Sequence, residues 1–275
     1  MIASTPRPWS RYVAIGDSFT EGMCDDDPHH EGRYLGWADR LAHRLAVVAA
    51  KDERTFSYAN LAVRGRLLAD IVDRQLPDAL ALRPDLVSIV AGGNDSLRPK
   101  ADVDALAARL DEAVGSIRAT GADVLMATPT DPRGAPLVGL TAGRAAMYIA
   151  NLYTIAARHD AYILNQWGLD SLKDWRMWAP DRIHMTPEGH ARVAAEAFHS
   201  LGFAEGDADW RVPLPPMESL PRREAVRANA QWARTYVGPW VHRRLTGRSS
   251  GDNITAKRPT LEVVDPHQEL PAPRF

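Results

Sequence analysis

Short apolar segments alternate with longer amphipathic ones from residue 11 to residue 201. Runs rich in Val, Ile, Leu and Ala that end at Gly or a polar loop are typical of buried strands, and apolar residues three or four apart are typical of helices. Because strands that alternate with helices form right-handed crossovers, this pattern predicts an α/β fold with a parallel sheet covered on both faces. The expected strands are residues 12–15, 56–63, 85–91, 122–127 and 161–164, and the expected helices are residues 35–48, 68–79, 103–117, 142–157 and 187–201.

The first expected strand ends in a polar loop. Its apolar run, residues 12–15, is followed by Gly16 and then by Asp17 and Ser18. In open α/β sheets ligands bind beyond the carboxyl ends of the strands, so Ser18 lies where chemistry usually takes place. Asp17 and Ser18 are also residues that build turns, and a purely structural turn is the alternative interpretation.

A later loop carries the two residues that would turn this serine into a nucleophile. An imidazole must accept the serine proton, and a carboxylate on the second ring nitrogen orients that imidazole. Asp181 precedes His184 by three residues, and Thr186 and Pro187 then suit the N-cap and first position of the last expected helix. We therefore expect a catalytic triad of Ser18, Asp181 and His184.

Acyl transfer also requires hydrogen-bond donors for the oxyanion that develops on the substrate. Gly65 follows the second expected strand and Asn94 follows the third. Glycine lets the backbone approach a ligand closely because it has no Cβ. We expect the backbone N–H groups of Ser18 and Gly65 and the side-chain amide of Asn94 to form the oxyanion hole.

Four sequence blocks resemble those of the SGNH hydrolase superfamily, also called GDSL-type esterases and lipases. The blocks are GDSFTEG with Ser18, NLAVRG with Gly65, GGND with Asn94, and DRIHMTPEGH with Asp181 and His184. They follow the family's order and span residues 11 to about 201, with Phe19 in place of the leucine of the family's name. The resemblance implies a flavodoxin-like three-layer α/β/α sandwich with a five-stranded parallel sheet in the order 2-1-3-4-5. It also implies hydrolysis of esters or thioesters without a metal or cofactor.

Composition argues against several other classes of protein. A net charge of −2 over 275 residues gives no general attraction to nucleic acid, and no apolar run is long enough for a membrane span. Residues 1–12 lack the basic and apolar segments of a secretion signal, so we expect a cytoplasmic protein. We expect its partner to be a small-molecule ester or thioester; the sequence leaves the oligomeric state open.

Residues 24–31 (CDDDPHHE) are dense in side chains that can bind metals. Contiguous ligands rarely converge on one ion, so we interpret this segment as an acidic loop near the mouth of the site and expect no metal. Cys24 has no dedicated base in the sequence and is expected to be a bystander thiol. We expect His190 to be a surface or half-buried residue of the last helix, and Asp95 to cap a turn.

Large side chains precede the last block, at Trp167, Trp175, Met177 and Trp178. They either line an apolar acyl pocket or pack in the core beneath an irregular loop, and the sequence favours neither interpretation.

Beyond Phe203 prolines and polar residues become frequent. Residues 218–245 are expected to form a helix that docks on the domain, because Trp232, Tyr236 and Trp240 form a partial apolar stripe. The expected organisation is a catalytic domain over residues 1–205, a linker and docked helix over residues 206–246, and a disordered or surface-draped tail over residues 247–275 that adds little to stability.

The C-terminal extension is also basic. Ten basic residues accompany three acidic ones between residues 211 and 258. Such a charge excess is typical of a solvated face and also suits an acidic partner.

These observations lead to three functional hypotheses. The first is a serine esterase or thioesterase that acts on small acyl groups through an acyl-enzyme on Ser18. The second is an acyltransferase that uses the same triad. The third is a non-enzymatic flavodoxin-like binding module, which the absence of a G-x-x-x-x-G-K phosphate loop disfavours.

Overall fold

A six-stranded sheet forms the centre of the molecule. The computed structural model describes residues 7–98, 100–135, 138–203, 209–217, 221–239 and 248–272. The strand order is β5-β4-β3-β1-β2-β6; the first five strands are parallel and β6 is antiparallel to β2. The strands are β1 (Arg11–Ile15), β2 (Ser57–Asn60), β3 (Leu86–Ile89), β4 (Asp123–Ala127), β5 (Tyr162–Leu164) and β6 (Arg258–Val263).

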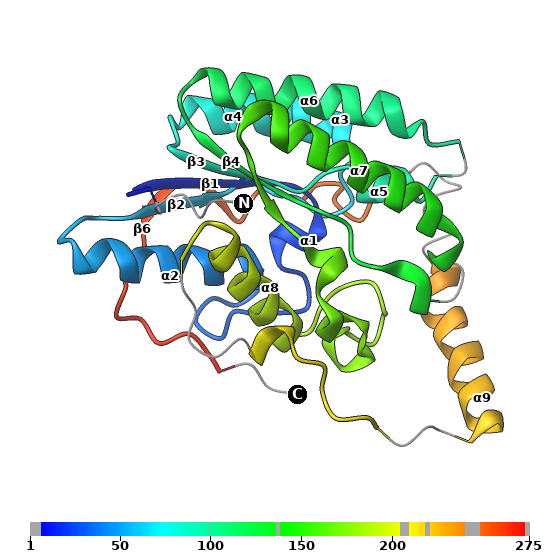
Figure 1. The fold of residues 1–275 in the computed structure, drawn as a ribbon. Helices are drawn as coiled ribbons and strands as arrows, with labels where there is room; N and C mark the ends of the chain where they lie inside the picture. Colours follow the sequence, from blue (N-terminus) through cyan, green and yellow to red (C-terminus); the bar gives the residue numbers. More distant parts are fainter. Residues whose placement is uncertain are drawn as a thin grey trace.

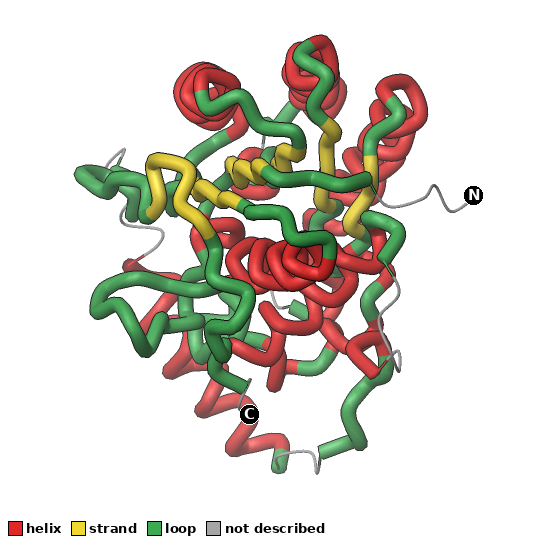
Figure 2. Tube along the Cα trace, turned by 90° about the vertical axis from the view of Figure 1, so that its left-hand side faces the viewer, coloured by secondary structure: helices red, strands yellow, loops and turns green. Residues whose placement is uncertain are grey.

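Helices cover both faces of this sheet, as Figures 1 and 2 show. Helices α2 and α8 lie on one face, and α3, α4, α6 and α7 lie on the other. The helices are α1 (Ser18–Glu21), α2 (Gly36–Lys51), α3 (Leu68–Asp70), α4 (Leu76–Ala81), α5 (Gly93–Ser96), α6 (Val103–Ala119), α7 (Ala142–His159), α8 (Pro187–Ser200) and α9 (Arg222–Trp232). The predicted α/β/α sandwich is confirmed, and the first five strands keep the order that the resemblance implied.

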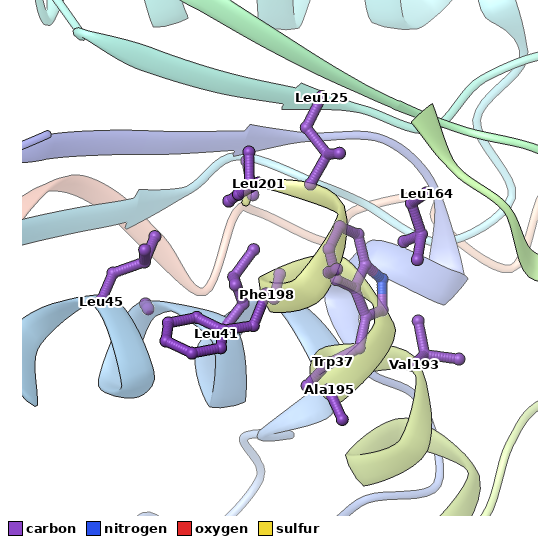
Figure 3. Packing of buried hydrophobic residues seen from close by; sticks show 14 of the residues in the cluster. Trp37, Leu41, Leu45, Leu125, Leu164, Val193, Ala195, Phe198 and Leu201 are labelled. Atoms are coloured by element: carbon purple, nitrogen blue, oxygen red, sulfur yellow. The ribbon is translucent and has the colours of Figure 1, made fainter. Parts of the chain in front are cut away.

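Alternate residues of the strands build two separate cores. Tyr12 and Ala14 of β1 belong to the cluster under α2 and α8, whereas Val13 and Ile15 belong to the cluster under α4, α6 and α7. Figure 3 shows the first cluster, in which Trp37 from α2 and Phe198 from α8 pack below the sheet. Because both faces are covered, the strands read as continuous apolar runs, which is why they are visible in the sequence.

The tail departs from expectation. Residues 258–263 form β6, which pairs with β2 along the sheet edge, and Val264 N–H donates to the Phe56 carbonyl at 3.0 Å. The prediction of a five-stranded sheet is therefore wrong by one strand, and the prediction of a disordered or surface-draped tail is wrong for these residues. The segment is half exposed and contains Pro259, which an edge strand tolerates. In the sequence alone, the same proline and polar residues are typical of a loop.

Helix α9 lies within the helix expected at residues 218–245. It continues into a π-helical turn, Ala233–Val237, and none of its described residues is buried. Trp240, one of the three aromatic residues expected to dock, lies outside the described residues, as do residues 218–220 and 273–275. Among the described helices, none has the length and apolar character needed to cross a membrane.

Candidate active site

Ser18 is the first residue of the short helix α1, at the carboxyl end of β1. Asp17 caps this helix, since its Oδ1 accepts a hydrogen bond from the Phe19 backbone N–H at 3.0 Å. The Ser18 hydroxyl makes no hydrogen bond within the described part of the chain, and the residue is half-buried. The turn thus places at the rim of the sheet a hydroxyl that has no hydrogen-bond partner among the described residues.

Asp181 and His184 form a compact unit on the loop before α8. Asp181 Oδ2 lies 2.6 Å from His184 Nδ1, and Asp181 Oδ1 accepts the backbone N–H groups of Ile183 and His184 at 2.9 and 3.0 Å. Burial raises the pKa of Asp181, but the hydrogen bond and charge of His184 and the two backbone bonds outweigh it and hold the pKa below its ordinary value. The carboxylate therefore stays ionised and fixes the ring through Nδ1, which leaves Nε2 for proton transfer.

Asn94 connects the loops that follow β1 and β2. Its Nδ2 donates to Asp17 Oδ2 at 3.1 Å and to the Arg66 carbonyl at 3.0 Å. Burial raises the pKa of Asp17 to about 6, although the bond from Phe19 and nearby His184 both lower it. Both amide hydrogens of Asn94 thus have acceptors, and donation to a substrate oxygen requires one of these bonds to weaken.

Gly65 has a left-handed backbone, with φ at +72°. A side chain there would be strained, and a Cβ would also lie 2.3 Å from Ser249 Oγ. Neither its backbone N–H nor that of Ser18 donates a hydrogen bond within the described residues. The two amides and the Asn94 side chain come from loops at neighbouring strand ends, as expected.

Comparison with known proteins decides the family. The model of the GDSL-like lipase/acylhydrolase family matches residues 14–192, which include all four blocks. The chain belongs to this family. The resemblance drawn from the four blocks is confirmed, and membership makes the chain an ester hydrolase.

Solved structures share the fold of this family member. The crystal structure of TesA is 24% identical, with a TM-score of 0.56 over 69% of this chain and 97% of that chain. A variant of Axe2, an acetyl-xylooligosaccharide esterase from Geobacillus stearothermophilus, is 21% identical, with a TM-score of 0.57 over 71% and 95%. LAE5, an enzyme from the metagenome of Lake Arreo, is 23% identical, with a TM-score of 0.59 over 70% and 95%. No curated protein sequence matches the chain.

Cys24 of this GDSL-family chain lies beside Asp181 and His184. Its Sγ and one ligand atom each from Asp181 and His184 lie within 4.8 Å of one another. The sequence gives no sign that Cys24 lies this close to His184, the base expected for Ser18. Burial raises the pKa of the thiol to about 11, and the carboxylates of Asp181 and Asp26 contribute. The thiol is protonated near neutral pH and is a poor nucleophile there.

Asp25 and Asp27 of the acidic loop bind other protein groups. Asp25 is buried and paired with Arg40, with Nε and Nη2 at 2.9 and 3.0 Å from its carboxylate oxygens. Asp27 accepts from the His29 backbone N–H and contacts the His30 ring, each at 2.9 Å. These carboxylates stabilise the loop, whereas Cys24, Asp181 and His184 are the described residues whose ligand atoms come together.

The large side chains before the last block differ in burial: some pack in the core, and others are partly exposed. Met177 is fully buried and Trp178 packs on the core, with its Nε1 donating to the Leu172 carbonyl at 2.7 Å. Trp175 is 41% exposed and packs on Arg182, whose Cζ is 5.5 Å from the ring centroid. Trp167, near the Arg133 guanidinium, is half-buried.

Helix α9 reaches the same loop. Trp232 Nε1 donates to the Asp181 carbonyl at 3.0 Å, and Arg182 lies against its ring as well as that of Trp175. Arg182 Nη1 also donates to Asn229 Oδ1 at 2.7 Å. The extension thus contacts Asp181, the carboxylate residue of the expected triad, at its backbone carbonyl.

His190 of the last helix and Asp95 of the third block form hydrogen bonds that stabilise the fold. His190 is fully buried, not on the surface or half-buried: its Nδ1 accepts from the Trp37 N–H, so Nε2 carries the proton and donates to the Met23 carbonyl, both at 3.2 Å. Burial lowers the pKa of His190 to about 4, so it is neutral. Asp95 accepts from the Leu68 N–H at 2.9 Å, at the start of α3, as a cap should.

Sequence reasoning missed Gln75, a buried residue that supports the turn leading to Ser18. Gln75 ends a π-helical turn, Ile71–Gln75, a feature often found near functional sites. Its Oε1 accepts from Gly16 N–H at 2.8 Å and its Nε2 donates to Gly16 O at 2.9 Å. The amide therefore extends the sheet pairing to the residue before Asp17. A lone glutamine in an amphipathic segment carries no signal of this role.

Proposed function

We propose that this GDSL-family chain is a serine esterase that hydrolyses carboxylic esters or thioesters of small acyl groups through an acyl-enzyme on Ser18. The observation that carries the proposal is the 2.6 Å contact between Asp181 Oδ2 and His184 Nδ1. His184 also lies close enough to Asp17, the residue before Ser18, to lower the pKa of the Asp17 carboxyl. A carboxylate-oriented imidazole is the group that activates a serine.

The proposed reaction has two halves. His184 Nε2 accepts the Ser18 proton as Oγ forms a bond to the substrate carbonyl carbon, and the carbonyl oxygen becomes an oxyanion. Its collapse breaks the bond to the alcohol or thiol, which leaves with the proton from His184. Water then attacks the acyl-enzyme with the same base, releasing the carboxylic acid and restoring the Ser18 hydroxyl.

The oxyanion is stabilised by the backbone N–H groups of Ser18 and Gly65 and by the Asn94 amide. The two backbone donors are supported by their lack of hydrogen-bond partners among the described residues. Asn94 contributes once its bond to Asp17 or to the Arg66 carbonyl weakens. The proposed chemistry needs no metal. Axe2, which shares the fold, is an acetyl-xylooligosaccharide esterase, and this is compatible with a short acyl group.

Covalent labelling tests the proposal. A fluorophosphonate probe should label the wild-type chain and Cys24→Ser but not Ser18→Ala, and the wild type should hydrolyse a chromogenic short-chain ester. Products formed with an added alcohol acceptor would separate hydrolysis from acyl transfer. Labelling that persists in Ser18→Ala and disappears in Cys24→Ser would contradict the assignment and make Cys24 the nucleophile.

A further inference from the structure

Residues 249–264, here called the C-terminal strap, lie outside the part of the chain that matches the family, which ends at residue 192. The three related structures are covered over 95–97% of their length, but they cover only 69–71% of this chain. The strap nevertheless contacts both loops that carry the proposed backbone oxyanion donors. Figure 1 shows its strand β6 beside β2, from which the Gly65 loop continues.

The first contact is with the Gly65 loop itself. Ser249 Oγ donates to the Gly65 carbonyl oxygen at 3.3 Å. The hydroxyls of Ser249 and Ser250 lie so close to Gly65 that a Cβ there would clash with both. Gly251 is buried against Arg64, the residue before Gly65. A Cβ on Gly251 would lie 2.0 Å from the Arg64 carbonyl oxygen. Backbone therefore packs directly on backbone at the loop that presents the Gly65 N–H.

The second contact is with α1, which begins at Ser18. Lys257 Nζ is buried and lies 2.7 Å from the carbonyl oxygen of Glu21, the last residue of that four-residue helix. The same ammonium lies 2.7 and 2.8 Å from the carbonyls of Tyr34 and Leu35 and 2.5 Å from Asp39 Oδ2. The strap thus fixes the end of the helix that carries the proposed nucleophile.

An ion pair between the buried Glu21 and the half-buried Arg64 connects the two loops. Glu21 Oε2 accepts the Arg64 backbone N–H at 2.7 Å, and Arg64 Nε lies 2.9 Å from Glu21 Oε1. Because Arg64 precedes Gly65 and Glu21 ends α1, this pair sets the separation of the two oxyanion donors. The strap packs on one partner through Gly251 and on the other through Lys257.

We propose that the C-terminal strap is a positioning element of the active site that holds the Gly65 loop against α1, so that the N–H groups of Ser18 and Gly65 converge on one substrate oxygen. The inference rests on the proposed esterase function and adds to it a contribution from beyond the family match. Misplacement of a catalytic group by about 1 Å can cost about a hundredfold in rate. Loss of the strap contact should therefore lower kcat and leave KM nearly unchanged, because the donors act mainly on the transition state.

Gly251→Ala tests this in the full chain. Gly251 has no left-handed backbone, so alanine adds no φ strain, but its Cβ cannot fit beside the Arg64 carbonyl without shifting the strap or the loop. Gly143→Ala is the matched control, since residue 143 is exposed and its Cβ would meet no atom within 4 Å. We expect kcat per fluorophosphonate-titrated site to fall about tenfold to a hundredfold in Gly251→Ala, with KM within about threefold, and to stay at the wild-type value in Gly143→Ala.

A second readout does not depend on activity. Amide hydrogen exchange of residues 61–66 should be faster in Gly251→Ala than in Gly143→Ala, because the strap no longer holds the loop. If Gly251→Ala does not fold, Ser249→Ala, which removes one hydroxyl at the contact, should show both effects in weaker form. Wild-type kcat per titrated site together with unchanged exchange in the folded variant would overturn the proposal. A wild-type chain that hydrolyses no ester would instead refute the proposed function, and the exchange result would still decide whether the strap holds the loop.

Discussion

The two sides of the proposed site are built in different ways. On the acid–base side, Asp181 holds His184 and accepts two further backbone N–H groups within a single turn of chain. On the oxyanion side, the donors sit on three separate loops joined by side chains: Asn94 connects Asp17 to Arg66, and Gln75 holds Gly16. The Asp181–His184 pair itself is closed within one turn, and α9 adds contacts to the Asp181 carbonyl and to Arg182. The oxyanion side has no such closed turn and depends on contacts between distant segments.

This difference has an energetic consequence. A turn orders few residues to form its contacts, whereas a multi-loop arrangement needs the surrounding fold to fix every loop. Substitutions on the acid–base side should therefore act on chemistry with little effect on stability. Substitutions on the oxyanion side should change chemistry and stability together.

The largest effect is expected for His184→Ala. Without the base, Ser18 is not activated, and kcat should fall by about 10⁴-fold or more, with the melting temperature close to that of the wild type. Steady-state kinetics and a thermal melt check both parts. His29→Ala, at an exposed histidine, is the control and should keep full activity. A loss of less than about tenfold in His184→Ala would mean that another group acts as the base.

Asn94→Ala should have the next largest effect. Loss of one oxyanion donor costs about 10²–10³-fold in kcat, with a smaller change in KM. The substitution also leaves the buried Asp17 carboxyl without the bond from Asn94 Nδ2, so the melting temperature should fall as well. If only KM rises, Asn94 is a substrate contact and the oxyanion hole consists of the two backbone amides.

The sequence predicts the parts of the fold and site that depend on nearby residues, and it misses the parts that depend on distant ones. The first five strands and the pair Asp181 and His184 are visible because their evidence is local: apolar runs in the strands, and a three-residue spacing in the loop. Lys257 and β6 are invisible because their stability comes from carbonyl oxygens and a sheet edge far away in the chain. An exposed edge strand that contains Pro259 has too few apolar residues to be distinguished from a loop.

The same limit applies to single residues. Nothing in the sequence distinguishes Gln75 from other polar residues of its segment, since its partner is the backbone of Gly16. Burial of His190 and the position of Cys24 beside His184 likewise depend on how α8 and α1 meet. The catalytic roles of Ser18 and His184 remain predictions that the labelling and kinetic experiments test.

Gln75→Leu should have an intermediate effect. Leucine fills a similar volume but removes both bonds to Gly16, and an unsatisfied buried backbone group costs about 1–3 kcal/mol. We expect a lower melting temperature and a kcat reduced by about tenfold, because the turn that carries Ser18 loses its support. Arg74→Ala, at a residue whose side chain is 72% exposed in the same π-helical turn, should change neither quantity. A stable Gln75→Leu variant with normal kcat would show that β1 alone fixes the turn that carries Ser18.

The smallest effect is expected for Cys24→Ser, although Cys24 lies on the acid–base side. Its pKa of about 11 lies above the ordinary thiol value of 9.0, so the thiolate fraction at pH 8 is below that of an ordinary cysteine and rises only as the pH approaches 11. Cys24→Ser should therefore keep kcat within about twofold. Iodoacetamide should modify the wild type slowly at pH 8 and faster with each rise in pH toward 11. Because Cys24 is the single cysteine of the chain, Cys24→Ser is the blank for this measurement. Fast modification at pH 8, together with a tenfold loss of kcat in Cys24→Ser, would mean that His184 also activates the thiol, and the acid–base side would then serve two nucleophiles instead of one.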